Sequence, residues 1–398
     1  MMKRWSVAGL GLAAVALLVM GYGSVAQGQA ESAKPIRIGA LFAVTGKAAW
    51  LGTPEKNTAQ MLVEQINAKG GIKGSRIELI VKDTESDDTK AVLAMRELID
   101  REKVAAIIGP SQSGESMAVK AIADEAQVPL ISCAAAETIV VPVTPWVFKT
   151  PQMDRHAVIR IFEYLNAKGI KQVGIISSTD GFGKAGRDQL IKLAPEYGLV
   201  IVADETYAPA DTDMTAQLTK IKAAGAQAVV NWSIAPAQSI VPKNMKQLGM
   251  DIQLFQSHGF GNIKYAQAAG EAAEGIIFPA GPLLAVDSLP DTHPQKKVLT
   301  EYRDAYQGKY NEPASTFGGH AYDAIHLVMK AIELGGPTRQ GIRDGLEKVQ
   351  GYIGTAGIFN LSPEDHCGLT KEAFEMLTVK GGKFVLLQEG PPAPPAAE

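Results

Sequence analysis

The sequence predicts an α/β fold of two doubly wound lobes, each a parallel sheet with helices on both faces. Short apolar runs typical of buried strands alternate with amphipathic helical segments, and this alternation occurs twice, before and after Pro151. The chain has 398 residues, enough for two domains of roughly 100–200 residues each. A hydrophobic fraction of 46% indicates a globular chain with a buried core. Strands that alternate with helices form parallel sheets covered on both faces.

The first half opens on an apolar strand over 36–42, which ends at a turn. A helix follows, with Ala59, Leu62, Val63 and Ile66 at the spacing of one helical face. Two consecutive glycines at 70–71 end that helix, as a left-handed cap requires. A strand with one polar face is expected from residue 77 to residue 81. Beyond it we expect helices over 88–103 and 115–127, and strands over 104–108 and 129–132.

The second half repeats this order. A helix carrying Val158, Ile161, Phe162 and Leu165 on one face closes at Gly169. We expect strands over 172–177, 199–203, 228–232 and 253–256, with further helices between them. Ligands of such sheets bind beyond the carboxyl ends of the strands. The loops in which to search for a site are therefore 45–52, 109–115, 133–137, 178–184 and 256–260.

The amino-terminal segment has the pattern of a secretory leader. Lys3 and Arg4 precede an apolar stretch over 7–20, which is shorter than the ~20 residues needed to span a bilayer. Small residues then offer cleavage after Ala26, with Ala30 as a second candidate. We expect a signal peptide over 1–26, cleaved on export, and a mature protein in the periplasm without a membrane segment. The proline-rich tail over 391–398 is expected to be disordered.

Charge and cysteine content exclude several classes of protein. The net charge of −3 provides no basic field for nucleic acid. The two cysteines, Cys133 and Cys367, are too few for a disulfide-rich scaffold or a cysteine metal cluster. An oxidising compartment would permit them to pair. Their spacing matches no disulfide framework, and we expect two unpaired thiols.

An enzyme alternative rests on the segment 181–186, which reads Gly-Phe-Gly-Lys-Ala-Gly after a strand and before a helix. Asp204 and Glu205 follow at about the distance of a ribose-binding acid, so an NAD(P)-binding oxidoreductase stays open as an alternative. The motif opens the second lobe, however, and the leader directs the chain away from the usual dinucleotide pool. The glycines also suit a tight strand-to-helix turn.

Two further patterns do not carry an enzyme hypothesis. The segment 109–114 is rich in Gly and Ser but does not have the spacing of a nucleophile elbow. His320, Asp323 and His326 share a helix without the spacing of a zinc helix, so both histidines are interpreted as packed or surface residues. We expect no catalysis, no metal and no cofactor.

Several segments, in this order along the chain, carry a resemblance to a known family: Ile38-Gly39-Ala40, Thr45-Gly46, the stretch 66–72, Ile107-Ile108-Gly109-Pro110, Gly181-Phe182-Gly183, Ala273-Glu274-Gly275 and Ala321-Tyr322-Asp323-Ala324. The chain resembles the type I periplasmic binding proteins of the leucine/isoleucine/valine transport family. The resemblance implies a clamshell of two lobes joined by a three-segment hinge. The first lobe comprises residues 34–150 and 281–355, and the second comprises residues 151–280 and 356–390. It also implies a monomeric, non-enzymatic subunit that delivers its ligand to an inner-membrane ABC permease.

The resemblance further implies a carboxylate clamp made by two loops. Ser111, Gln112 and Ser113 match the first loop of the family, and Ala134, Ala135 and Ala136 match the second. The family's amino-acid binders hold the ligand ammonium at positions that correspond to Ala136, Ile234 and His258, and none of these supplies the family's oxygen acceptor. A buried cation without an acceptor is costly. We therefore expect a carboxylate ligand that lacks an α-ammonium group.

Apolar and ring side chains complete the expected site. Trp50 and Leu51 lie in the first loop, Phe182 in the fourth, Trp232 at a strand end and Phe317 near a later helix start. Flat apolar side chains around a carboxylate clamp suit an aromatic acid of the benzoate or phenylpropanoid type, as some members of the family bind. His258 could donate to a ring hydroxyl or to the carboxylate. A branched-chain or other hydrophobic amino acid is the alternative ligand.

Overall fold

The computed structural model describes residues 34–388, which contain two large sheets. The expected leader over 1–26 and the tail over 391–398 lie outside these residues. The first sheet has the order β2-β1-β3-β4-β5, and all its neighbouring strands are parallel. Its strands are β1 (Ile36–Phe42), β2 (Ile77–Asp83), β3 (Ala106–Ile108), β4 (Leu130–Ser132) and β5 (Val147–Lys149).

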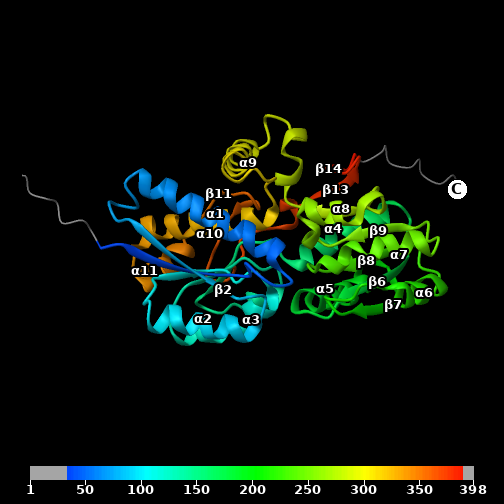
Figure 1. The fold of residues 1–398 in the computed structure, drawn as a ribbon, viewed down its shortest axis with the longest axis horizontal. Helices are drawn as coiled ribbons and strands as arrows, with labels where there is room; N and C mark the ends of the chain where they lie inside the picture. The colour runs from blue at the N-terminus through cyan, green and yellow to red at the C-terminus, as the bar shows by residue number, and fades with distance from the viewer. Residues whose placement is uncertain (1–33, 389–398) are drawn as a thin grey trace, which may run out of the picture. The chain divides into compact units, whose positions relative to one another are not determined.

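Helices cover both faces of this first sheet. They are α1 (Ala49–Ala68), α2 (Asp88–Asp100), α3 (Ser113–Glu125), α10 (Thr316–Gly335) and α11 (Arg339–Leu346). Figure 1 shows α2 and α3 on one side of the sheet and α1 with α10 on the other. The sheet and these helices form the first lobe. Helix α10 returns to it from far along the chain, because its buried face joins the same core as β1 and α1.

The second sheet has the order β14-β13-β10-β9-β8-β6-β7. Its strands are β6 (Gln172–Ser178), β7 (Val200–Tyr207), β8 (Ala228–Trp232), β9 (Gln253–Gln256), β10 (Ile277–Ala280), β13 (Glu375–Lys380) and β14 (Lys383–Leu386). The expected parallel arrangement is confirmed for β6 to β10. Two antiparallel strands, β13 and β14, extend the sheet at one edge and were not expected.

The second lobe consists of this sheet and its helices α4 (Asp154–Ala167), α5 (Gly181–Leu193), α6 (Thr215–Ala223), α7 (Val241–Gln247) and α8 (Ile263–Ala269). Short 3-10 turns complete the connections: η1 (Glu137–Ile139), η2 (Ala194–Tyr197), η3 (Pro236–Ser239), η4 (His258–Phe260), η5 (Gly270–Ala273), η6 (Pro282–Ser288) and η7 (Lys371–Ala373). Helix α9 (Lys296–Tyr310) and η6 pack through Tyr302 and Leu283 in a third cluster with Met61 of α1. No helix within residues 34–388 is both long and apolar enough to span a membrane.

The chain crosses between the lobes three times, and the last crossing differs from the expected boundary. Phe359 and Leu361 are fully buried in the core of the first lobe, as is Cys367, whereas the sequence assigned every residue from 356 to the second lobe. A small hairpin of β11 (Tyr352–Ile353) and β12 (Ile358–Phe359) turns this segment back onto the first lobe. We place the third crossing between Leu369 and Phe374, because Phe374 packs in the core of the second lobe.

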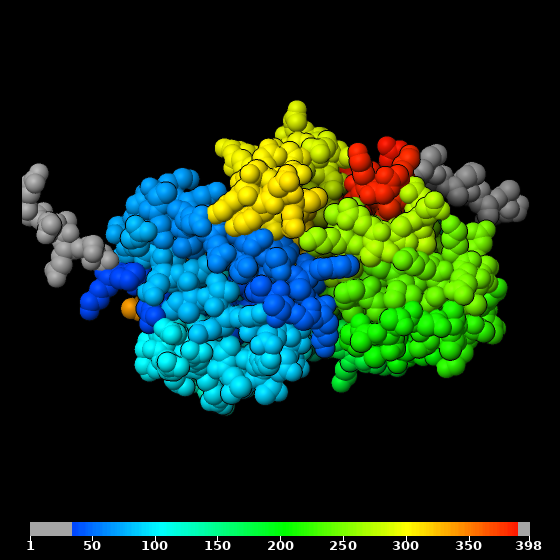
Figure 2. Space-filling view, viewed as in Figure 1, coloured from blue at the N-terminus to red at the C-terminus, as the bar shows by residue number. Residues whose placement is uncertain are grey.

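The individual elements agree closely with the periodicity of the sequence. The strand limits at 36–42, 228–232 and 253–256 are confirmed. Helix α3 begins at Ser113 rather than at residue 115, since Gln112 has extended backbone angles and serves as its N-cap. This earlier start places Ser113 in the first helical turn. Cys133 and Cys367 are free and buried, as expected. Figure 2 shows the two lobes in contact along a groove.

Candidate functional site

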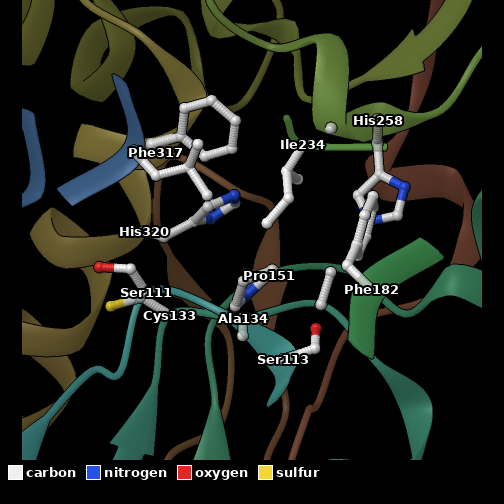
Figure 3. A pocket seen from close by; sticks show the side chains of 13 residues that line it. Ser111, Ser113, Cys133, Ala134, Pro151, Phe182, Ile234, His258, Phe317 and His320 are labelled. Atoms are coloured by element: carbon white, nitrogen blue, oxygen red, sulfur yellow. The ribbon is translucent and has the colours of Figure 1, made fainter. Parts of the chain in front are cut away.

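A pocket lies between the lobes at the carboxyl ends of the strands. Its lining comes from the segments after β3, β4, β5, β6, β8 and β9 and from the starts of α1 and α10, as expected for ligand sites of doubly wound sheets. The thirteen lining residues are Leu51, Ser111, Ser113, Cys133, Ala134, Ala135, Pro151, Phe182, Ile234, His258, Gly259, Phe317 and His320. Figure 3 shows Ser113 and Ala134 on one side of the pocket and Phe317, Ile234 and His258 on the other.

Two serines of the loop after β3 have different hydrogen bonds. The Ser113 hydroxyl oxygen accepts from the Ala136 N–H at 3.3 Å, which leaves its own proton free to donate. Ser113 also lies at the amino terminus of α3, where the helix dipole favours an anion. The Ser111 hydroxyl oxygen accepts from the Ala43 N–H at 3.0 Å, and its proton is donated to the buried Glu55 carboxyl. Ser113 is therefore the serine hydroxyl that is available to a bound carboxylate.

A buried lysine lies next to the second expected clamp loop. The Lys149 ammonium, at the end of β5, donates to the Ala135 carbonyl oxygen and, at 3.5 Å, to that of Gln152. Burial lowers the pKa of Lys149, and nearby acids, including Asp154 and Glu137, oppose that shift. A protonated Lys149 places positive charge behind the loop that contains Ala135. Both the charge and the Ser113 hydroxyl favour an anionic group at this end of the pocket.

Rings from the second lobe enclose His258. The imidazole centroid lies 5.2 Å from that of Phe182, 5.5 Å from that of Trp232 and 5.4 Å from that of Phe374. Each pair has edge-to-face geometry, which is a favourable arrangement for aromatic rings. The polar atoms of these side chains are the two ring nitrogens of His258 and the Trp232 indole nitrogen, and none of the three has a hydrogen-bond partner among the described residues.

The glycine-rich segment at the start of α5 is accounted for by packing. A Cβ at Gly186 would lie 2.0 Å from the Trp232 indole nitrogen, so only glycine fits there without a shift of the ring. The acid expected to bind ribose, Asp204, accepts from the Arg187 side chain at 2.7 Å, and Glu205 forms an ion pair with Lys220 at 2.9 Å. Neither acid is free in the way that a ribose site requires, so the geometry gives no support to dinucleotide binding.

Nine of the thirteen residues that the sequence proposes for the site line this pocket: Leu51, Ser111, Ser113, Ala134, Ala135, Phe182, Ile234, His258 and Phe317.

The other four proposed residues lie outside the lining. Trp50 packs edge-on against Tyr265, with ring centroids 5.1 Å apart. Gln112 is a buried helix cap, and Ala136 is buried with its N–H bonded to Ser113. Trp232 is fully buried behind Phe182 and His258. These four residues support the wall rather than form it, because each is engaged with neighbouring side chains or backbone.

Sequence reasoning missed Cys133, Pro151, Gly259 and His320. His320 was interpreted as a packed or surface residue, yet its side chain faces the pocket (Figure 3). It lies three residues after Phe317 on α10, and residues at that spacing share a helical face. Because Phe317 was already proposed for the site, its helical spacing to His320 could have indicated His320 as a lining residue.

The ionisable groups around the pocket are shifted by burial. Desolvation lowers the pKa of His320 to about 3 and that of His258 well below its ordinary value, so both imidazoles are neutral near pH 7. Burial raises the pKa of Asp154 to about 7. His258 Nε2 lies 3.7 Å from the nearer Asp154 carboxylate oxygen, beyond the usual hydrogen-bond distance. Within residues 34–388 no group of three or more potential metal ligands occurs.

The structure has two α/β lobes, and loops from both lobes line the pocket between them. This arrangement defines the class of two-lobed ligand-binding proteins. A family model described as periplasmic binding protein matches residues 35–383, and the chain belongs to that family. The relatives reported next are named as binding proteins.

Relatives and solved structures agree with this assignment. The chain is 25% identical over 323 residues to the leucine-, isoleucine-, valine-, threonine-, and alanine-binding protein of Pseudomonas aeruginosa, a match that covers 81% of this chain and 83% of that protein. An extracellular ligand-binding receptor from Rhodopseudomonas palustris HaA2 has a TM-score of 0.84 at 29% identity, covering 89% of this chain and 99% of the other. The substrate binding protein LivJ of Streptococcus pneumoniae, in complex with isoleucine, has a TM-score of 0.77 at 30% identity, with the same coverage.

Proposed function

We propose that this chain is the exported, monomeric binding subunit of an ABC importer, which captures a small aromatic carboxylate in the periplasm and delivers it to a membrane permease. One observation carries the choice of ligand: the thirteen lining residues include no aspartate or glutamate. The same lining has a free serine hydroxyl at a helix amino terminus, with a buried lysine behind the adjacent loop. These groups suit a carboxylate and leave an ammonium without an acceptor of opposite charge.

The two nearest buried carboxyls do not replace that acceptor. Glu55 is behind Ser111, which donates to it, and Asp154 is behind His258. Burial raises the pKa of Glu55 well above its ordinary range and that of Asp154 to about 7, so neither carboxyl is a strong anion at neutral pH. A ligand ammonium would have to reach either carboxyl through a wall residue.

The opposite side of the pocket supports the aromatic part of the proposal. Phe182 and Phe317 come from different lobes, and both line the pocket with Leu51 and Ile234. Planar apolar ligands gain from contact with such side chains.

A branched-chain amino acid is the second candidate, favoured by the names of the relatives. The Pseudomonas aeruginosa relative is named for binding leucine, isoleucine, valine, threonine and alanine, and the Streptococcus pneumoniae structure holds isoleucine. For this ligand, Asp154 would have to ionise and approach the ammonium past His258. That rearrangement makes the amino acid the less favoured ligand on the geometry.

A thermal-shift panel on the refolded, ligand-free chain separates the two candidates. We expect benzoate or 3-phenylpropionate to raise the melting temperature, since a ligand at about 100 times its Kd stabilises the folded state by about 2.7 kcal/mol. We expect leucine and isoleucine to have no effect. Ser113→Ala serves as the matched variant, because it deletes the proposed carboxylate donor and should reduce the shift markedly at the same ligand concentration. Stabilisation by leucine but by no aromatic acid would show the ligand assignment to be wrong.

A further inference from the structure

Two histidines of the pocket have ring nitrogens without a hydrogen-bond partner among the described residues. They are Nδ1 and Nε2 of His258 and Nδ1 of His320. Both side chains are only 7% exposed. Buried polar groups in folded proteins are nearly always hydrogen-bonded, and a buried group without a partner destabilises the folded state. Two such side chains in one pocket therefore indicate a place where a ligand provides the missing partners.

The two histidines belong to different lobes and line the same pocket. His320 lies in the first turns of α10, and the Thr150 hydroxyl donates to its carbonyl oxygen at 3.0 Å. His258 lies in η4 of the second lobe, fixed among Phe182, Trp232 and Phe374. Figure 3 shows both imidazoles at the pocket, with His320 next to Phe317 and His258 next to Phe182. A ligand group that reached both would contact both lobes.

The charged groups nearby do not provide those partners. Asp154 is the closest acid to His258, and at 3.7 Å its carboxylate oxygen is too far for a hydrogen bond. Lys149 and His156 also face His258, and both disfavour its protonation, as does His320. Lys149 likewise disfavours protonation of His320. The pair is consequently uncharged near neutral pH.

A neutral imidazole has one N–H donor and one acceptor nitrogen. Two of them can donate to a carbonyl oxygen, or donate to and accept from a hydroxyl. They offer no charge to balance an ammonium or a second carboxylate. The anionic group of the ligand has its own place at Ser113, next to the loop that Lys149 supports.

We propose that His258 and His320 each provide a polar subsite for an uncharged oxygen of the ligand, so that the ligand is a hydroxy or oxo carboxylic acid rather than a plain aromatic acid. This inference rests on the proposed function and deepens it by naming the substrate class. A ligand without the extra oxygen leaves the imidazoles without a hydrogen-bond partner. Sites built to hydrogen-bond a polar group of the ligand strongly reject analogues that lack this group.

Titration calorimetry with paired ligands tests the subsite. The pairs are 3-phenylpropionate with phenylpyruvate, 3-phenylpropionate with 3-(4-hydroxyphenyl)propionate, and leucine with its oxo analogue 4-methyl-2-oxopentanoate. In the unmodified chain we expect the oxygenated member of at least one aromatic pair to bind about tenfold or more tightly than its parent acid. We expect the oxo analogue to bind more tightly than leucine.

Variants then assign the effect to the two histidines. His258→Phe and His320→Phe should each reduce the preference for the oxygenated acid over its parent acid, compared within the same variant, to within about threefold. His326→Phe is the matched control, since His326 lies further along α10, outside the lining, and contacts the Tyr322 carbonyl oxygen at 2.9 Å. It should retain the preference.

The outcomes separate this inference from the proposed function. Equal affinities within both aromatic pairs would overturn the subsite and leave the aromatic-acid proposal standing. Binding of leucine with no binding of any acid in the panel would overturn both. The comparison of paired ligands on the unmodified chain stands even if a histidine variant does not fold.

Discussion

Asn262 joins the two lobes through a hydrogen bond, and its replacement by aspartate should weaken that contact selectively. Its side-chain amide donates to the Trp50 carbonyl oxygen at 3.0 Å, from the start of α8 in the second lobe to α1 in the first. Its side-chain oxygen accepts from the Lys264 N–H at 3.0 Å and so caps α8. Aspartate retains the cap acceptor and loses the amide donor.

The magnitude follows from one hydrogen bond between the lobes. A typical hydrogen bond contributes about 0.5–1.5 kcal/mol net, and aspartate adds repulsion between a carboxylate oxygen and the Trp50 carbonyl. We expect Asn262→Asp to disfavour the state with the lobes in contact by about 1–2 kcal/mol, roughly a 5- to 30-fold change in that equilibrium. Ligand affinity should fall by up to the same factor, since the ligand contacts both lobes only in that state.

Small-angle scattering and calorimetry check this prediction. Ligand-free Asn262→Asp should have a larger radius of gyration than the unmodified chain, and its affinity for phenylpyruvate should be lower. Trp50→Phe is the control, because it retains the backbone carbonyl and an aromatic ring against Tyr265, and it should change both quantities less. If Asn262→Asp has the scattering curve and the affinity of the unmodified chain, the hydrogen bond does not hold the lobes together.

Three further changes have directions that follow from the structure. Ser113→Ala should weaken binding of carboxylates by about 10- to 100-fold in calorimetry, since hydrogen bonds to charged groups contribute about 1.5–3 kcal/mol, and unchanged affinity would remove Ser113 from the site. Gly186→Ala should displace Trp232 and so destabilise the chain by about 1–3 kcal/mol in urea titration. Gly308→Ala is the control, because open space surrounds the added Cβ, and an equal loss of stability in the two variants would refute the packing argument. Asp154 has a pKa of about 7 in the folded state against about 4 in the unfolded state, so its contribution to stability falls as pH rises from about 4 to 7. Asp154→Asn should therefore lose less unfolding free energy than the unmodified chain between pH 5 and pH 8 in urea titrations. An equal loss in both proteins would contradict this prediction.

Local periodicity explains why many of the elements were predictable. The strands over 228–232 and 253–256 are short apolar runs between helical segments, and such runs have few alternatives within a chain of alternating strands and helices. The start of α3 was missed by two residues because the N-cap is Gln112, a residue type without a strong capping preference. The antiparallel β13 and β14 were missed because pairing direction is not encoded in apolar spacing.

The loops that hold the site were predictable for a different reason. Parallel strands bring their carboxyl ends to one edge of a sheet, so the loops after β3 and β4 had to converge at the edge of the first sheet, and those after β6 and β9 at the edge of the second. Within those loops the sequence did not distinguish residues that face the pocket from those behind it. Trp50 and Trp232 were proposed as ligand contacts, and both pack against neighbouring rings instead. Ser111 lines the pocket, but its hydroxyl is bonded to Glu55.

The sequence alone therefore determined the α/β class, the two lobes and the edge at which a ligand is expected, because these depend on apolar spacing and on the order of elements along the chain. Tertiary structure decided which side chains meet there. His320 joins His258 in the pocket although 62 residues separate them, since α10 returns to the first lobe after the chain has formed the parallel strands of the second. Burial, which arises only when both lobes are assembled, then sets the charge of these imidazoles and of Asp154.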